Sequence, residues 1–161
     1  MKSNSKRENG ISGGGSVGMI PKIRVFAKAG TKELFGGGYD RDQMFYEIRD
    51  IDFYDEDVTV WGCHRKNCGM CDDTYKMEDV KIMMSTGMKD KDGVEIYEGD
   101  ILYHPLQGAR RVFYPYSDSV ASYGLREVKT GFGCTLQDAH AVWQVIGNIY
   151  ENPELLEGIN E

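Results

Sequence analysis

Residues 86–103 read TGMKDKDGVEIYEGDILY and contain two turn signals and two short apolar segments. The pair Asp92-Gly93 is typical of a tight hairpin turn, because glycine tolerates a positive φ and aspartate can bond to nearby backbone. Residues 94–97 then alternate apolar and polar side chains, as a half-buried strand does. Residues 98–100 give a second turn signal, and residues 101–103 resume a strand. The stretch therefore predicts chain reversals within an antiparallel sheet.

The same stretch is rich in carboxylates, which could instead form a site. A calcium-binding loop places its ligands at alternate positions and a glycine sixth, whereas Gly93 comes fourth after Asp90. The register is therefore wrong for that loop. We expect the acids to lie in turns or on a solvated strand face: Asp90, Asp92, Glu95, Glu98 and Asp100.

Composition favours a mainly β protein. The 161 residues suit one domain, or one domain with a small lobe, and twenty glycines and ten tyrosines accompany only four prolines. The sequence contains no apolar run of the roughly 20 residues that span a bilayer and no signal peptide, so we expect a cytoplasmic protein with reduced cysteines. The net charge of −7 disfavours nonspecific binding to phosphate backbones.

The chain divides by composition. Residues 1–18 are polar and rich in glycine and serine, so we expect a disordered leader, with Met19 as the natural start of translation. The remainder, 19–158, reads as one β-rich domain with an N-terminal lobe at 19–79, a small barrel at 80–150 and a helical turn at 151–158. Strands are predicted at 20–26, 58–61, 78–84 and 142–150, with a bulge or a close backbone approach at Gly147 and with Asn152 as the cap of the terminal turn.

Three segments of the sequence resemble the YopX family of phage and prophage proteins. They are the stretch quoted above, the closing VIGNIYENPELLE and the opening MIPKIRVF from Met19. The resemblance extends from Met19 to about Glu157. It implies a β-rich fold whose C-terminal half is a small barrel of the Src-homology-3 type, in which the turn at residues 99–101 begins a strand. It also implies a phage or prophage origin inside a bacterium, and it implies no particular activity.

The segment WGCHRKNCGMCDD is the candidate metal site. Cys63, Cys68 and Cys71 have C-x4-C-x2-C spacing, and a Cys-x-x-Cys turn can hold zinc through both sulfurs. His64 or the distant Cys134 would complete a tetrahedron. The alternatives are an iron–sulfur loop, free thiols, or a redox pair formed by the last two cysteines. The cluster departs from the YopX pattern.

The segment GARRVFYPYS is the candidate nucleic-acid-binding face. Arg110 and Arg111 lie beside Tyr114 and Tyr116, and arginine with exposed aromatic rings can stack single-stranded bases. The alternative is an ordinary strand whose alternate side chains fill the core.

The sequence contains no recognisable catalytic pattern. It lacks the G-x-S-x-G nucleophile turn and the glycine-rich phosphate loop with its following lysine. We therefore expect a non-enzymatic accessory protein that needs no cofactor and acts on a protein partner or on a second copy of itself. Nucleic-acid binding through the arginine–tyrosine segment is the alternative function.

Overall fold

The computed structural model describes residues 22–28, 42–61, 72–127 and 130–157. The prediction of a mainly β protein is confirmed, since the described part of the chain contains twelve strands and only short helical segments. The strands are β1(Ile23–Ala27), β2(Gln43–Phe45), β3(Ile48–Asp52), β4(Asp57–Trp61), β5(Asp72–Lys76), β6(Val80–Lys89), β7(Glu95–Tyr97), β8(Asp100–His104), β9(Gly108–Phe113), β10(Gly124–Arg126), β11(Gly133–Thr135) and β12(Gln144–Asn148). The helical segments are η2(Met77–Asp79), α1(Leu136–Ala139), η3(His140–Val142) and η4(Pro153–Leu156).

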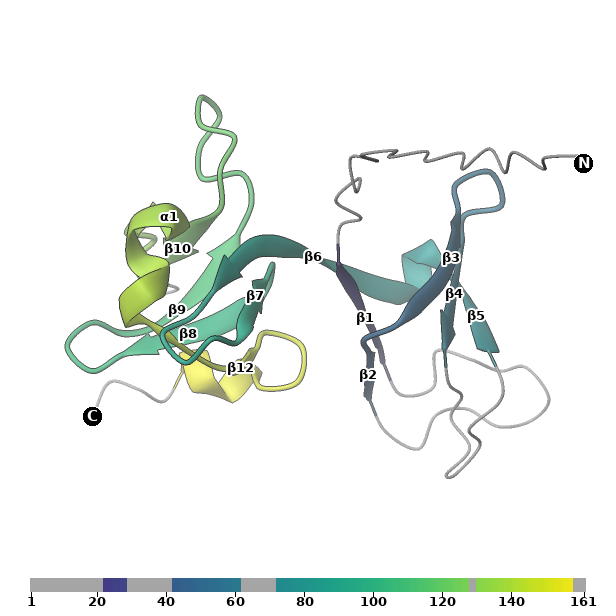
Figure 1. The fold of residues 1–161 in the computed structure, drawn as a ribbon, viewed down its shortest axis with the longest axis horizontal. Coiled ribbons are helices and arrows are strands. Elements are labelled where there is room, and N and C mark those ends of the chain that lie inside the picture. The colour runs from purple at the N-terminus through teal and green to yellow at the C-terminus, as the bar shows by residue number, and fades with distance from the viewer. Residues whose placement is uncertain (1–21, 29–41, 62–71, 128–129, 158–161) are drawn as a thin grey trace, which may run out of the picture.

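Three antiparallel sheets make up two lobes. The N-terminal lobe holds the sheet β3-β4-β5 and most of the sheet β2-β1-β6-β7, and the C-terminal lobe holds the curled sheet β11-β10-β9-β8-β12 (Figure 1). Each lobe has its own core. The N-terminal core is built around Val25, Val58, Val60 and Tyr75, and the C-terminal core around Leu102, Val112, Leu125, Leu136 and Trp143.

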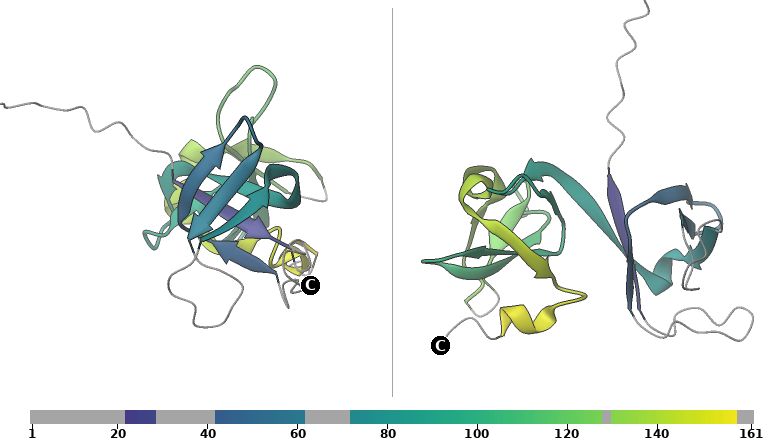
Figure 2. Two further views of the ribbon diagram at one scale, coloured as in Figure 1. Left: turned by 90° about the vertical axis from the view of Figure 1, so that its right-hand side faces the viewer. Right: turned by 60° about the horizontal axis from the view of Figure 1, so that its bottom comes forward.

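Strand β6 joins the lobes. Its first half, Val80 to Met84, pairs with β1, and its second half pairs with β7 beside the C-terminal sheet. Figure 2 shows the strand running from one lobe into the other. The predicted strand at 78–84 therefore began two residues too early, because residues 77–79 form η2, and ended five residues too early. Residues 85–89 continue it because β7 supplies a new partner, which local sequence does not reveal.

Strand β1 is buried on both faces. Val25 and Ala27 point into the N-terminal core. Because side chains alternate along a strand, Arg24 and Phe26 point the other way. There the Phe26 ring stacks on Tyr150 with centroids 5.4 Å apart, and Arg24 forms an ion pair with the buried Asp100. These contacts attach β1 to the C-terminal lobe.

The acids of residues 86–103 shape the turns, as predicted, but Asp90 and Asp100 are buried and not solvated. The carboxylate of Asp90 accepts hydrogen bonds from the backbone N–H groups of Asp92 and Val94 at 2.9 and 2.8 Å, and from Val145 at 2.8 Å. The hairpin therefore has a five-residue loop, longer than the predicted two-residue turn. Asp100 accepts the backbone N–H of Tyr97 at 2.8 Å, within the second turn.

The C-terminal segment differs from its prediction in two respects: the strand covers residues 144–148 instead of 142–150, and the terminal turn has a different cap. The bulge at Gly147 is confirmed by a register shift between β12 and β8. Asn152 comes directly before η4 but makes no side-chain cap. Instead, the side-chain oxygen of Asn148 accepts the N–H groups of Tyr150 and Glu151, each at 3.0 Å. The cap prediction was wrong: the N–H of Leu155 donates to the main-chain carbonyl of Asn152 at 3.1 Å, and the side-chain oxygen of Asn152 lies against Gly147, 2.5 Å from where an added Cβ would be.

Candidate functional site

Most of the predicted metal ligands lie outside the described residues. This holds for Cys63, His64, Cys68 and Cys71. Cys134 is described in β11, where its sulfur lies 3.7 Å from Nη1 of Arg110. Within the described ranges, no three His, Cys, Asp or Glu side chains gather closely enough to hold a metal ion. The zinc site therefore remains a prediction.

The two arginines predicted to share one face lie on opposite faces of β9. Arg110 is 7% exposed, faces the C-terminal core and has its guanidinium 5.2 Å from the ring centre of Trp143. Arg111 points the other way and pairs in register with Arg126 of β10. The reason is the two-residue period of a strand. The predicted four-residue face is therefore not formed.

The two predicted tyrosines have different surroundings. Tyr114 is 48% exposed, and its ring centre lies 5.2 Å from that of Tyr123. The Tyr116 ring packs against Phe113 at 6.3 Å, and its hydroxyl donates to the carbonyl of Gly133 at 3.4 Å. Of the four predicted residues, Arg111 and Tyr114 remain together beside a cavity.

That cavity, here called the arginine pocket, has a volume of about 340 Å³ and lies beside the turn between β7 and β8. Its polar and aromatic wall includes Glu98, Arg111, Phe113, Tyr114, Arg126 and Tyr150. The guanidinium of Arg126 lies 4.0 Å from the ring centre of Phe113. Burial raises the pKa of Glu98, and the charge of Arg111 partly opposes that rise. The pKa of Tyr150 is also raised, mainly by burial and then by the charge of Glu98.

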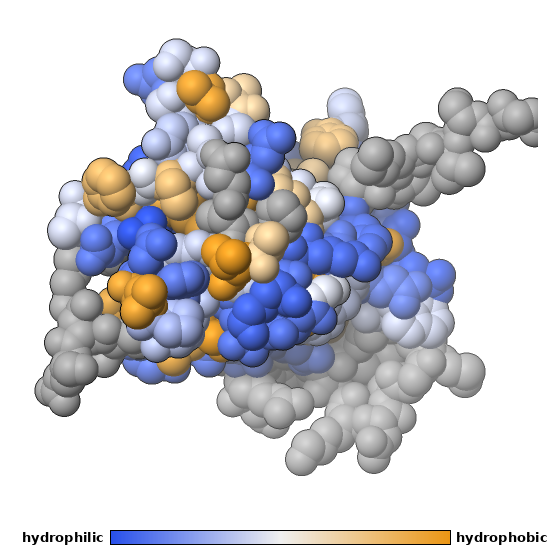
Figure 3. Space-filling model, turned by 60° about the vertical axis from the view of Figure 1, so that its left-hand side comes forward, coloured by the Kyte–Doolittle hydropathy of each residue, from blue (hydrophilic) through white to orange (hydrophobic). Residues whose placement is uncertain are grey.

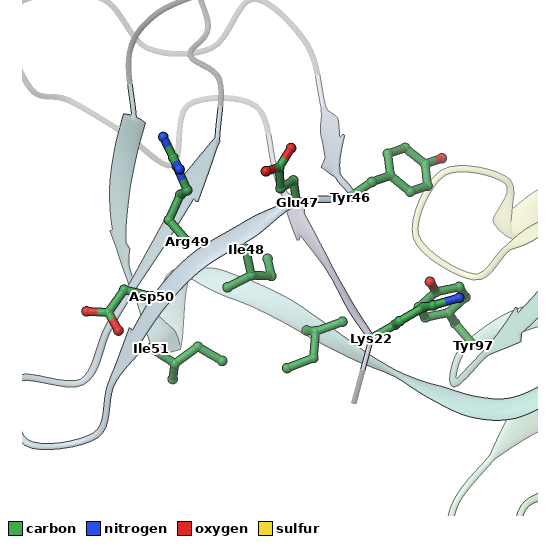
Figure 4. A pocket seen from close by; sticks show the side chains of 9 residues that line it. Lys22, Tyr46, Glu47, Ile48, Arg49, Asp50, Ile51 and Tyr97 are labelled. Atoms are coloured by element: carbon green, nitrogen blue, oxygen red, sulfur yellow. The ribbon is translucent and has the colours of Figure 1, made fainter. Parts of the chain in front are cut away.

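A second and larger hollow, here called the groove, has a volume of about 530 Å³. Figure 4 shows it beside β3, with β1 and β7 on its other side. It is lined by Lys22, Ile23, Tyr46, Glu47, Ile48, Arg49, Asp50, Ile51 and Tyr97. Tyr46, Lys22 and Tyr97 lie at the end nearest the C-terminal lobe (Figure 4).

The apolar floor of the groove depends on a bulge. Ile48 and Ile51 are three positions apart, so a regular strand would place them on opposite faces. The pairing of β3 with β4 shifts register between Ile48 and Asp50. Such an extra residue lets both isoleucines pack against the N-terminal core beside Ile23. Figure 4 shows Glu47 and Arg49 pointing to the other side of the strand.

Some charged side chains around the groove have ion-pair partners, and others have none among the described residues. Lys22 forms an ion pair with Glu95, and Arg49 pairs with Asp72 at 3.3 Å. Glu47 and Asp50 form no ion pair with any residue of the described ranges. The lining therefore offers two carboxylates that have no ion-pair partner in the part of the chain that the structure describes.

Strand β3 is also an edge. In the sheet β3-β4-β5 it pairs only with β4 among the described strands. Five consecutive residues, Glu47 to Ile51, line the groove. The groove therefore lies along a strand that has no partner on its outer side among the described strands. An edge strand beside a hollow is a place where an extended chain can pair.

The C-terminal lobe offers no comparable apolar surface on the face drawn in Figure 3. There hydrophobic residues form separate spots among hydrophilic ones. Scattered exposed apolar side chains are normal in soluble proteins and indicate no binding site.

Sequence reasoning missed both hollows. No local signal revealed the bulge in β3 or its position at the edge of the sheet. No sequence pattern indicated that Arg126 belongs to a site, because only the register of β9 against β10 places it beside Arg111.

Comparisons with known proteins identify a family. A solved structure, the crystal structure of protein EF1440 from Enterococcus faecalis, is similar to the chain at 26% identity, covering 85% of this chain and 98% of that one, with a TM-score of 0.47. No curated protein matches the chain. None of the helices in the described ranges has the length and apolar character to cross a membrane. The family model described as YopX protein matches residues 39–157. The chain therefore belongs to the YopX family.

Proposed function

We propose that this protein is a non-enzymatic interaction module that binds an extended segment of a protein partner in the groove. The observation that supports this most strongly is the row of four consecutive groove-lining residues, Ile48 to Ile51, on the edge strand β3. An extended peptide that adds to such an edge gains main-chain hydrogen bonds, and its alternate side chains enter neighbouring pockets.

The chemistry of the lining defines the partner segment. Ile23, Ile48 and Ile51 provide an apolar floor for every second side chain of the peptide. Glu47 and Asp50 would attract lysine or arginine at intervening positions. The net charge of −7 would speed the approach of such a basic segment. The partner segment is therefore one that alternates apolar and basic residues.

We also propose an origin, a cellular location and a C-terminal fold for the protein. The YopX resemblance supports a phage or prophage protein that works in the bacterial cytoplasm. It further supports a C-terminal lobe of the Src-homology-3 type closed by the turn at residues 151–158. The meander order β11-β10-β9-β8 and the curl of the sheet around Leu102 and Val112 are compatible with such a small barrel.

A parallel peptide-display selection on the wild-type protein and on Asp50→Lys tests the proposal. Asp50 is exposed and unpaired within the described ranges, so reversing its charge should leave the fold intact. The wild type should enrich peptides with alternating apolar and basic residues. Their affinity for Asp50→Lys should fall about fivefold, the scale of an exposed charge pair. The control Asp55→Lys carries the same reversal outside the groove lining and should bind like the wild type.

Three outcomes would contradict this function. They are selected peptides without basic residues, equal binding to Asp50→Lys, and no enrichment at all. Sedimentation of the free protein tests the other occupant, a second copy of the chain. A dimer that dissociates in Asp50→Lys would mean that the groove serves self-association.

A further inference from the structure

The arginine pocket carries more positive charge than its surroundings balance. Arg111 and Arg126 are direct register partners on adjacent strands, where like charges destabilise a sheet. Neither arginine forms an ion pair with any residue of the described ranges. Glu98 is the one acid among the residues that line the pocket. Two neighbouring arginines without an ion-pair partner among the described residues favour an anionic ligand.

The two guanidinium groups favour a particular anion. Each presents a planar fork of N–H donors, which matches the oxygens of a phosphate group. Arg126 is held in place by the ring of Phe113 at 4.0 Å, so its fork is partly oriented before a ligand arrives. A phosphate bridging both arginines would replace their repulsion with charge-assisted hydrogen bonds.

The cavity is larger than a phosphate ion needs. Its volume of about 340 Å³ is at the lower end of the range for small-molecule sites. The half-exposed ring of Tyr114 lines it and is backed by Tyr123. Such a ring can stack on a nucleobase, which presents a π-face whatever its identity.

We propose that the arginine pocket binds a nucleotide, with its phosphate group between Arg111 and Arg126 and its base against Tyr114. Glu98 limits the affinity, because its carboxylate competes with the phosphate for Arg111. This site is separate from the groove, and its failure would leave the proposed peptide binding untouched.

Calorimetric titration of the full chain tests the proposal with three probes: inorganic phosphate, a nucleoside 5′-monophosphate and the unphosphorylated nucleoside. The monophosphate should bind at least about tenfold more tightly than either fragment, since it makes both the ionic and the stacking contacts. Arg111→Gln and Arg126→Gln should each weaken its binding about tenfold or more. Glu98→Gln should strengthen it. The control Lys81→Gln removes one positive charge from an exposed position of β6 and should change nothing.

Two additions make the result decisive. Arg126→Lys keeps the charge and most of the packing on Phe113, so a loss of affinity in that folded variant indicates the fork geometry and not unfolding. A 5′-phosphorylated single-stranded tetranucleotide, compared with the mononucleotide, shows whether the phosphate comes from a free nucleotide or a strand end. The proposal is overturned if the monophosphate does not bind, if it binds no better than inorganic phosphate, or if both arginine-to-glutamine variants bind as the wild type does.

Discussion

Replacing Arg24 with methionine should destabilise the protein severely, because it breaks the buried ion pair that attaches β1 to the C-terminal lobe. Asp100 is 0% exposed, and Arg24 also lies 4.0 Å from the ring centre of Tyr97. Methionine keeps the apolar stem and removes the charge. The change leaves a carboxylate in the junction between the lobes with no cation beside it. Breaking a buried pair on one side costs about 3–5 kcal/mol.

The protonation of Asp100 sets an upper limit to that cost. Burial raises the pKa of Asp100, and Arg24 opposes the rise, so the variant should have a still higher pKa. A carboxyl with an unfolded pKa of about 3.9 can be protonated at pH 7 for about 4 kcal/mol, so the unpaired charge cannot cost more. We therefore expect a loss of about 3–4 kcal/mol in the free energy of unfolding. With a urea slope of about 2 kcal/mol per M, the unfolding midpoint should fall by about 1.5–2 M.

The pH dependence has a defined sign. A carboxyl whose folded pKa is raised supports the fold below its unfolded pKa, and that support is lost as the pH rises through the folded pKa. The gap between wild type and Arg24→Met should therefore be largest at pH 7. At about pH 3.5 it should shrink to about 1 kcal/mol, the scale of the lost contact with the Tyr97 ring.

Urea unfolding at both pH values, followed by circular dichroism, measures these differences. Lys22→Met is the matched control, because Lys22 also pairs across the junction, with Glu95, but is exposed to solvent. It should leave the midpoint unchanged. The double variant Arg24→Met/Asp100→Asn should be more stable than Arg24→Met, since no buried charge remains and the asparagine can still accept the N–H of Tyr97. A loss below about 1 kcal/mol at pH 7, or an equal loss at both pH values, would refute the reasoning.

Three further changes test other parts of the fold. Asp90→Ala leaves three backbone N–H groups without their acceptor and should lower the free energy of unfolding by about 2–4 kcal/mol, whereas the exposed Asp92→Ala should cost less than about 0.5 kcal/mol; similar losses would contradict the assigned role. Gly99 and Gly93 both have positive φ, 82° and 84°, but an added Cβ meets side chains from 3.3 Å only at Gly99. Thermal melting should therefore show a larger loss for Gly99→Ala than for Gly93→Ala, which carries only the backbone strain of about 1–2 kcal/mol. Because burial raises the pKa of Glu98, its ionisation weakens the fold as the pH rises through that pKa. Glu98→Gln should be more stable than the wild type at pH 7 and equally stable at about pH 3, and an unchanged midpoint at pH 7 would count against this reading.

Local signals in the sequence predicted individual elements well. The Asp-Gly and Glu-Gly-Asp signals gave both chain reversals of the opening stretch, and the apolar alternation gave β1 and β4. A bulge was among the predictions for Gly147, because a glycine inside a strand has no side chain to pack and often marks a bulge or a close backbone approach. These features depend on a few neighbouring residues, so the local sequence is sufficient to predict them.

The candidate sites depend on strand faces, strand register and a bulge, none of which can be predicted from the local sequence. Arg110 and Arg111 looked like one basic pair, yet the strand sends one into the core and the other to the arginine pocket. Arg126 joins that pocket through the register of two strands. The groove exists because a bulge turns Ile48 and Ile51 to the same side of an edge strand.

The β class and the two turns could be predicted without the fold, because turn chemistry and alternation are short-range signals, and the YopX family was indicated by the resemblance of three segments. Which acids are buried, and what surrounds them, is known only from the folded structure. Asp100 and Glu98 are two residues apart in one turn, but one meets Arg24 from a strand more than seventy residues away and the other borders a cavity. The partner and solvent exposure of a charged group are set by packing between distant segments, so their electrostatic roles follow from the fold and not from the turn that contains them.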